Sequence, residues 1–314
     1  MSALTAAVER VRGREAVRGP RRKLSLRDTW WRHAVGIFAG IVALFPVWFV
    51  ASAAFNRDSS VSGTTFLPQH PTVKNFTEIV RNRGPDKTFQ GYVESHFLRW
   101  LANTLLVATL TAIGTVLLGA LAAYAFSRFR FRGRRLGMLA LLLIQMFPQL
   151  LLVVSLYLIV LNVGGIFPVM GLNTYTGLIV VYLGGSLGVN AWLLKGFFDT
   201  IPSELDESAR VDGATAAQIF WGVVLPLAAP ILVVVGVISF ISTLNEFVIA
   251  SALMQTQGHL TLPVGMNGFI DQQYGQRWGP FAAGAMIAAI PATAIFISVQ
   301  KWLIGGLTQG AVKG

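Results

Sequence analysis

The chain has 314 residues, of which 54% are hydrophobic and only 12% charged. A soluble domain of this length could not bury so much apolar surface, so we predict an all-α integral membrane protein. The chain contains no cysteine, which excludes a disulfide framework and thiolate metal sites. Its net charge of +11 is explained by basic segments beside a membrane, so no nucleic-acid partner is expected.

Long runs without Asp, Glu, Lys or Arg predict the membrane spans, because a span needs about 20 apolar residues. The longest run, 136–194, exceeds one span and is divided by a segment rich in Gly, Pro and Asn at 163–175, which predicts a loop. The sequence therefore predicts six transmembrane helices, near residues 34–55, 99–126, 136–161, 176–195, 227–251 and 280–303.

The distribution of basic residues predicts the orientation. With both termini placed in the cytoplasm, the inner segments hold 18 Lys and Arg residues and the outer segments hold 7. This bias predicts cytoplasmic termini, with a basic N-terminal segment (1–32) near anionic lipid. A cleaved signal peptide is the alternative for the N-terminus, because "ASA" at 51–53 resembles a cleavage site. The apolar and basic regions before it are long for a signal peptide.

The sequence offers little for catalysis. It contains no P-loop motif, so no ATP site is expected in this chain. "GGSLG" at 184–188 matches G-x-S-x-G, which leaves an intramembrane hydrolase as a remote alternative. The four histidines lie at span edges or in outer loops, so none is expected beside Ser186 to act as its base. We interpret the small residues of this motif as residues that allow close helix packing, and we expect no catalytic residue and no metal site in the chain.

Three polar or helix-breaking residues fall within or at the edges of predicted spans. Gln145 and Pro148 lie in "QMFPQLL", where a proline frees a backbone carbonyl that can line a wet cavity. Glu246 is the one acid within or at the edge of a predicted span. A translocation path and a purely structural role both fit these residues.

The stretch "ELDESARVDGAT" (204–215) concentrates acid between the fourth and fifth spans. It predicts two short helices. Ser203 is the expected N-cap of the first, with an apolar side made of Leu205, Ala209 and Val211. Gly213 is expected to end this helix in the left-handed conformation. Thr215 then caps the second helix in a capping box with Gln218.

A short amphipathic helix between two spans, with acid outward, fits the cleft of a soluble partner that offers basic residues. The alternative is a solvated loop whose charges only keep it in water. The residue pattern leaves both open.

Counted from Glu207, this stretch is similar to the E-A-A, three residues, G, nine residues, I-x-L-P signature of binding-protein-dependent importer permeases. Ser208 stands for an alanine and Val223 for the isoleucine. The resemblance implies a loop that couples the permease to paired ATPase subunits. The residues that it implies for coupling are Glu204, Glu207, Ser208, Ala209, Asp212, Gly213, Ala214, Leu225 and Pro226.

From about residue 95 onward, "AYAFSRFRFRG", "GLNTYTG" and "QKWLIGGLTQGAVKG" resemble the smaller permease subunit of maltose/maltodextrin importers (MalG type). The resemblance implies a heterodimer with a second homologous permease, two copies of an ABC ATPase that binds ATP and Mg, and an extracytoplasmic sugar-binding protein. It implies that Gln257, Gly258, His259 and Leu260 contact the binding protein. It also implies an ATPase-contacting tail of Gly306, Leu307, Thr308, Gly310, Lys313 and Gly314.

The resulting expectation is a permease domain at 33–305, with an outer loop at 57–98 and a coupling loop at 196–226, followed by a cytoplasmic tail at 306–314. The resemblance implies alternating access for maltose, maltodextrin or a related glucoside such as trehalose. An importer of another solute class is the main alternative, because the coupling signature is shared among such importers.

Overall fold

The computed structural model describes residues 26–57, 66–81, 96–270 and 277–311. The chain divides into two compact units, residues 1–49 and 50–314. Most of α2 (Leu26–Ala54) belongs to the first unit, and the other helices belong to the second.

The described helices of the second unit confirm an all-α integral membrane fold. Five described helices, α2 included, are long and apolar enough to cross a membrane, or six if a bent pair at Ala216–Leu244 forms one span. Within the second unit, α4 packs against α7 and α11, and α11 packs against α14. In chain order the elements are α3 (Lys74–Arg81), α4 (Phe97–Arg128), α5 (Arg134–Gln145), α6 (Gln149–Ile166), η1 (Pro168–Met170), α7 (Tyr175–Phe198), α8 (Glu204–Val211), α9 (Ala216–Ile219), η2 (Phe220–Val224), α10 (Leu225–Leu227), α11 (Ala229–Leu244), α12 (Val248–Leu253), α13 (Leu262–Asn267) and α14 (Trp278–Ala311).

The predicted third span, 136–161, is not one helix. α5 ends at Gln145, and α6 begins only after Pro148. Proline has no N–H to donate, and its ring disfavours helical backbone at the residue before it. Pro148 takes the N-cap position of α6 with φ −60° and ψ 118°. The prediction of a continuous helix across this segment is therefore wrong.

The predicted fifth span, 227–251, is also divided, because α11 ends at Leu244 and α12 follows a short break. Glu246 lies in that break. Its carboxylate accepts hydrogen bonds from the backbone N–H groups of Ile249 at 2.8 Å and Ala250 at 3.0 Å. These N–H groups stand at the start of α12, where a helix has no backbone partners of its own for them. An acid can therefore lie here because it caps a helix.

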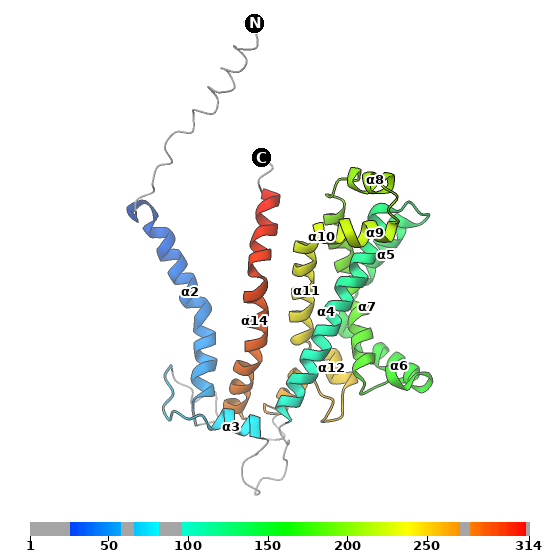
Figure 1. The fold of residues 1–314 in the computed structure, drawn as a ribbon. Coiled ribbons are helices and arrows are strands. Elements are labelled where there is room, and N and C mark those ends of the chain that lie inside the picture. The colour runs from blue at the N-terminus through cyan, green and yellow to red at the C-terminus, as the bar shows by residue number, and fades with distance from the viewer. Residues whose placement is uncertain (1–25, 58–65, 82–95, 271–276, 312–314) are drawn as a thin grey trace. The chain divides into compact units, whose positions relative to one another are not determined.

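The outer loop predicted at 57–98 contains α3, which the sequence pattern did not indicate; residues 58–65 and 82–95 of that loop lie outside the described residues. Asn75 of α3 is buried, and its amide donates to the backbone oxygens of Ala54 at 2.9 Å and Asn56 at 2.8 Å. Glu78 of α3 lies 2.8 Å from Arg277, just before α14. These contacts fix α3 at the end of the second unit opposite α8 (Figure 1).

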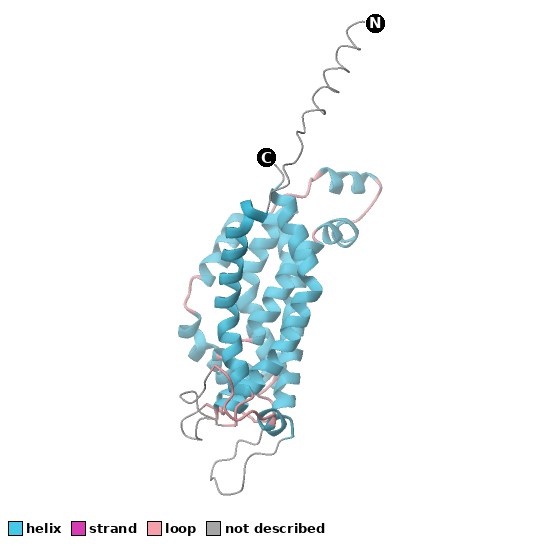
Figure 2. Ribbon diagram, turned by 90° about the vertical axis from the view of Figure 1, so that its left-hand side faces the viewer, coloured by secondary structure: helices cyan, strands magenta, loops and turns pink. Residues whose placement is uncertain are grey.

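Residues 199–228 connect α7 to α11 and are called the coupling segment below. One buried cluster, which we call the coupling-end cluster, joins this segment to the membrane helices. Side chains from α4, α7, α11 and the coupling segment meet in it, and small residues on α4 allow the close approach. Its members are Ala120, Ala123, Tyr124, Leu194, Phe198, Ile201, Ile219, Phe220, Val224, Ala228, Leu232 and Val235. Figure 2 shows the coupling segment projecting from one end of these packed helices.

At the opposite end, α13 packs on α4 with no room for a side chain at Gly265. A Cβ at this position would lie 2.2 Å from Cδ2 of Trp100, a fully buried ring. The indole N–H of Trp100 donates to the backbone oxygen of Gln257 at 2.9 Å, so the ring cannot move away without losing that bond.

Replacing Gly265 by alanine should therefore destabilise the protein by about 1–3 kcal/mol, the usual cost of overpacking a core. The measurement is the thermal unfolding midpoint of the purified full-length chain in detergent. Gly184→Ala is the control, because an added Cβ at this position in α7 meets no atom within 4 Å. Equal unfolding midpoints for the two variants would contradict this packing.

Candidate functional site

The turn between α8 and α9 has the conformation that the sequence predicts. Gly213 has φ +85°, in the left-handed region where a Cβ is costly. The N–H of Gly213 donates to the backbone oxygen of Arg210 at 3.0 Å, and the N–H of Ala214 donates to the backbone oxygen of Ala209 at 2.9 Å. This pair of bonds is the Schellman arrangement, which satisfies the last carbonyls of a helix.

The second short helix begins with the predicted capping box. The backbone N–H of Thr215 donates to Gln218 Oε1 at 2.8 Å, and its hydroxyl accepts from the N–H of Gln218 at 3.3 Å. A π-helical segment, Phe220–Val224, follows. The chain then bends by 78° between Ala216–Leu227 and Ala229–Leu244. This bend, at Ala228, turns the coupling segment into α11.

A buried ion pair holds α8 against the end of α4. Nε of Arg128 lies 2.8 Å from Oδ2 of Asp206, and the two side chains are only 9% and 3% exposed. Nε of Arg128 and both carboxylate oxygens of Asp206 form no hydrogen bond of good geometry with a described residue. The pair is therefore held by the attraction between the two charges. Arg128 also donates to the backbone oxygen of Ile201 at 2.9 Å. Arg128, the last residue of α4, therefore contacts both α8 and the segment that precedes α8.

A second contact ties the start of the coupling segment to α4. The hydroxyl of Ser127 donates to Asp199 at 2.6 Å, and Nζ of Lys195 lies 2.5 Å from the same carboxylate. Partial burial raises the pKa of Asp199, but the bonds from Lys195 and Ser127, together with the charges of Lys195 and Arg134, hold it below its ordinary value. Asp199 therefore remains ionised near neutral pH.

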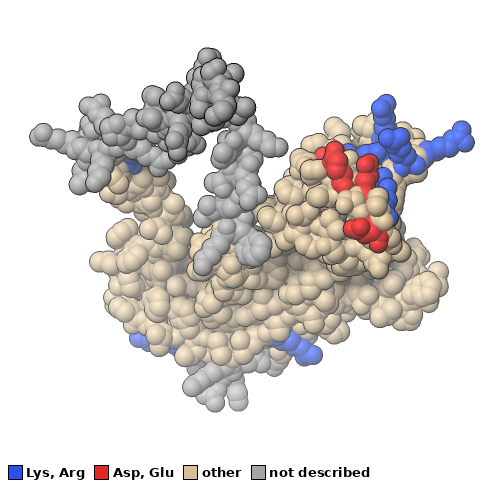
Figure 3. Space-filling view, turned by 45° about the horizontal axis from the view of Figure 1, so that its top comes forward, with Lys and Arg blue, Asp and Glu red and all other residues tan. Residues whose placement is uncertain are grey.

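The outward surface of α8 combines acid with exposed apolar side chains, which corrects the predicted apolar side. Leu205 is 43% exposed and Val211 is 88% exposed, whereas Asp206 faces inward. Ala209 is half-buried, as predicted, and Ser203 occupies the N-cap position without a side-chain capping bond. The exposed members of the predicted coupling set are Glu204, Glu207, Ser208, Asp212, Gly213 and Pro226, while Ala214 and Leu225 are half-buried. Figure 3 shows acidic side chains gathered at this end, beside the basic residues of the α4–α5 connection.

A cavity of about 660 Å³ lies between α7, α11 and the α5–α6 region. Each of α7 and α11 contributes polar residues three or four positions apart, so they share a helix face. The polar lining consists of Gln149, Tyr182, Ser186, Asn190, Ser239, Ser242, Thr243 and Glu246. The Tyr182 hydroxyl donates to Glu246 at 2.5 Å. Of the residues predicted for a translocation path, Glu246 lines this cavity, and Gln145 and Pro148 do not.

Gln145 and the "GGSLG" motif form contacts between α5 and α7. The amide of Gln145 donates to the backbone oxygen of Gly185 at 2.6 Å. A Cβ at Gly188 would lie 2.8 Å from the backbone oxygen of Leu141, so glycine is needed where α5 crosses α7. Ser186 lies 2.8 Å from Thr115, hydroxyl to hydroxyl, and no histidine is among the described residues that line its cavity.

The loop at residues 257–260 is fixed on α4. The amide of Asn103 donates to the backbone oxygens of Gly258 at 3.1 Å and Leu260 at 2.9 Å. Gln257 is exposed, Gly258 and His259 are half-buried and Leu260 is buried. Gln257 is thus the best placed of the four predicted residues to meet a partner, and Leu260 anchors the loop.

The predicted tail begins inside a helix. α14 continues to Ala311 and so includes Gly306, Leu307, Thr308 and Gly310. Lys313 and Gly314 lie outside the described residues.

Comparison with known proteins identifies the chain. Residues 115–309 match the family of inner membrane components of binding-protein-dependent transport systems. The chain belongs to this family. Its members are permease subunits of transporters, so the chain is a multi-pass membrane permease and not an enzyme, and the hydrolase alternative for Ser186 is wrong.

Curated relatives cover most of the chain. The maltose/maltodextrin transport system permease protein MalG of Vibrio vulnificus (strain YJ016) is 38% identical over 295 residues, covering 92% of this chain and 98% of the relative. The galactooligosaccharides transport system permease protein GanQ of Bacillus subtilis (strain 168) is 36% identical over 277 residues, covering 88% and 93%. MalG of Escherichia coli (strain K12) is 45% identical over 217 residues, covering 69% and 73%.

Solved structures share the fold of the permease. A chain of a bacterial ABC transporter involved in the import of the acidic polysaccharide alginate has a TM-score of 0.69 and 24% identity, covering 91% of this chain and 100% of the other. A chain of the MetNI methionine ABC transporter has a TM-score of 0.51 and 21% identity, covering 65% and 93%.

Sequence reasoning missed two sets of residues. Arg128 and Asp206 form the joint beneath α8, although neither was singled out for coupling. A signal was present, because Asp206 lies three residues before Ala209 and so shares its inward face. The polar face of α7 was also missed, although Tyr182, Ser186 and Asn190 recur every four residues.

The ion pair can be tested by removing one partner and then both. Asp206→Ala leaves Arg128 as an unpaired buried charge, which should cost about 3–5 kcal/mol, whereas Arg128→Met/Asp206→Leu removes both charges and should recover most of that loss. The measurements are the unfolding midpoint and the rate of proteolysis within the coupling segment of the purified chain. The exposed Glu207→Ala is the control. A double variant as unstable as the single variant would show that the pair does not hold α8.

Proposed function

We propose that this permease is one of two homologous membrane subunits of an ATP-driven sugar importer, with two separate ATPase subunits that bind ATP and Mg. The observation that carries the proposal is the coupling segment: a capped, sharply turned pair of short helices held to α4 by the Arg128–Asp206 pair. A solvated loop needs no such buried joint. Curated relatives named as sugar permeases support the solute class.

The outward surface of α8 is proposed to dock into the ATPase. Leu205 and Val211 expose apolar area next to the carboxylates of Glu204 and Glu207. Such a surface fits a cleft with an apolar floor and basic residues at its rim. Closure of the ATPases would push on α8, and the buried joint would carry that movement into α4. The tail at 306–314 is proposed as a second contact with the ATPases.

The polar cavity is proposed to line half of the translocation path. Its hydroxyl, amide and carboxylate groups can exchange hydrogen bonds with the hydroxyl groups of a sugar, whereas an apolar wall could not. A second homologous permease would complete the path. Glu246 is already bonded to Tyr182 and to the start of α12, so we propose that it orients the Tyr182 hydroxyl at the cavity wall.

The proposed orientation places α8 and both termini in the cytoplasm, in line with the bias of basic residues. The loop at residues 257–260 then lies outside, where Gln257 can meet a sugar-binding protein. The proposed substrate is maltose, a maltodextrin or a related glucoside such as trehalose. Galactooligosaccharides are the second candidate, because GanQ is similarly related.

Glu207→Lys reverses the charge of an exposed residue on α8 and should repel a basic ATPase cleft. Truncating one partner of a buried charge pair at an interface costs about 2–5 kcal/mol, and charge reversal should cost at least as much. The chain should still insert, because insertion depends on the spans. The measurement is the amount of ATPase that co-purifies with the chain from membranes.

Gln257→Lys is the control at the other end of the molecule and should retain the ATPase. Full ATPase content and normal transport in Glu207→Lys would instead make the acidic stretch a solvated loop.

The substrate is tested with the cognate binding protein and the reconstituted transporter. Maltose or a maltodextrin should bind that protein and stimulate ATP hydrolysis. Stimulation by galactooligosaccharides alone would select the second candidate. A binding protein that takes amino acids or phosphate and no sugar would contradict the proposed solute class.

A further inference from the structure

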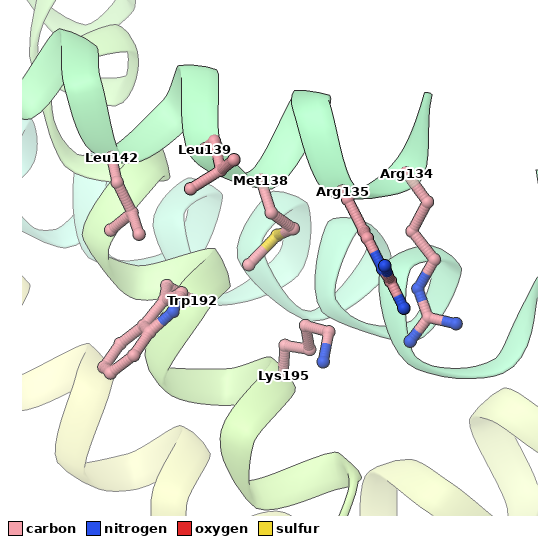
Figure 4. Close-up of a pocket in the computed structure, with 7 residues that line it drawn as sticks. All are labelled: Arg134, Arg135, Met138, Leu139, Leu142, Trp192 and Lys195. Carbon is pink, nitrogen blue, oxygen red and sulfur yellow. The ribbon is translucent and has the colours of Figure 1, made fainter. Parts of the chain in front are cut away.

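A groove with a basic rim runs between the start of α5 and the end of α7 (Figure 4). It has a volume of about 560 Å³. α5 supplies one wall and α7 supplies the other. The lining residues are Arg134, Arg135, Met138, Leu139, Leu142, Trp192 and Lys195.

The groove carries unbalanced positive charge at one end. Figure 4 shows Arg134, Arg135 and Lys195 together at that end. Asp199 pairs with Lys195 and also interacts with the charge of Arg134 at longer range, but Arg134 and Arg135 form no ion pair with any described residue. Two guanidinium groups are therefore left to bind an anion, and a guanidinium matches the geometry of a phosphate.

The backbone adds to this positive end. α5 begins at Arg134, and its N-cap residue Gly133 has φ +86° and offers no side chain to cap the helix. No acidic residue lies in the first turn. The N–H of Arg134 donates to the backbone oxygen of Phe131 at 3.4 Å, but the N–H groups of the two following residues and the positive end of the helix dipole favour the same anion as the two arginines.

The rest of the groove is apolar. Met138, Leu139 and Leu142 line it from α5, and Trp192, 52% exposed, lines it from α7. Arg134 and Leu142 are eight residues apart, or about 12 Å along a helix at 1.5 Å per residue. This length fits within one leaflet, since the hydrocarbon core is about 30 Å thick. One end of the groove can thus meet headgroups while the other meets acyl chains.

We infer that this groove binds one anionic phospholipid, with its phosphate at Arg134, Arg135 and the start of α5 and an acyl chain along Met138 and Trp192. Charge complementarity selects the anionic lipid over a zwitterionic one. α5 touches α7 near Gly188 but has no buried residue of its own, and the lipid lies in the groove beside the Lys195–Asp199 pair. Lipid binding at this site requires neither the sugar nor the ATPase, so it can be tested separately from the proposed transport function.

The test is native mass spectrometry of the purified full-length chain with phosphatidylglycerol and phosphatidylcholine of the same acyl chains. The chain should retain phosphatidylglycerol in preference. Arg134→Gln/Arg135→Gln should weaken that binding about 25-fold, at about fivefold for each cation near a membrane surface. Binding of phosphatidylcholine should change little. Arg99→Gln, at the other end of α4, is the matched control and should leave the preference intact.

Three outcomes would overturn the inference. The chain could show no preference for phosphatidylglycerol, or Arg99→Gln could lose as much binding as the double variant. In the assembled transporter, the double variant could keep the lipid preference but lose the second permease, which would assign the groove to that subunit. An unchanged unfolding midpoint in the double variant confirms that any loss of lipid is not caused by misfolding.

Discussion

The buried pair of Arg128 and Asp206 is the interaction on which the coupling segment depends. It joins the last residue of a long membrane helix to a short helix of the coupling segment, with both charges removed from water. A buried charge is stable only while its partner is present. The pair therefore holds α8 against the end of α4, which is the contact through which the proposed movement of α8 would pass to α4.

The coupling-end cluster makes the same connection by packing. Ile219, Phe220 and Val224 of the coupling segment are buried among side chains of α4, α7 and α11. Close-packed protein interiors transmit displacement because they hold few voids to absorb it. The ion pair, the Asp199 contact and this cluster thus connect the coupling segment to three membrane helices at once. Such a connection is what a permease driven by separate ATPases requires.

Features set by a few neighbouring residues could be predicted from the sequence. Gly213 and the Thr215–Gln218 capping box depend on local backbone chemistry, and the spans depend on composition. Features set by distant partners could not. The inward position of Asp206 depends on Arg128, 78 positions earlier in the chain, and the break at Glu246 depends on Tyr182 as well as on α12. Pro148 was visible in the sequence, but whether it bends or ends a membrane helix depends on its neighbours.

The central claim is that α8 and α4 move as one body. The chain has no cysteine, so spin labels can be placed at Leu110→Cys on the exposed face of α4 and at Ser208→Cys on α8. Double electron–electron resonance then measures the distance between the labels in the assembled transporter. The account predicts one narrow distance distribution that is the same without nucleotide and with ATP bound. A distribution that shifts or splits when ATP binds would contradict it.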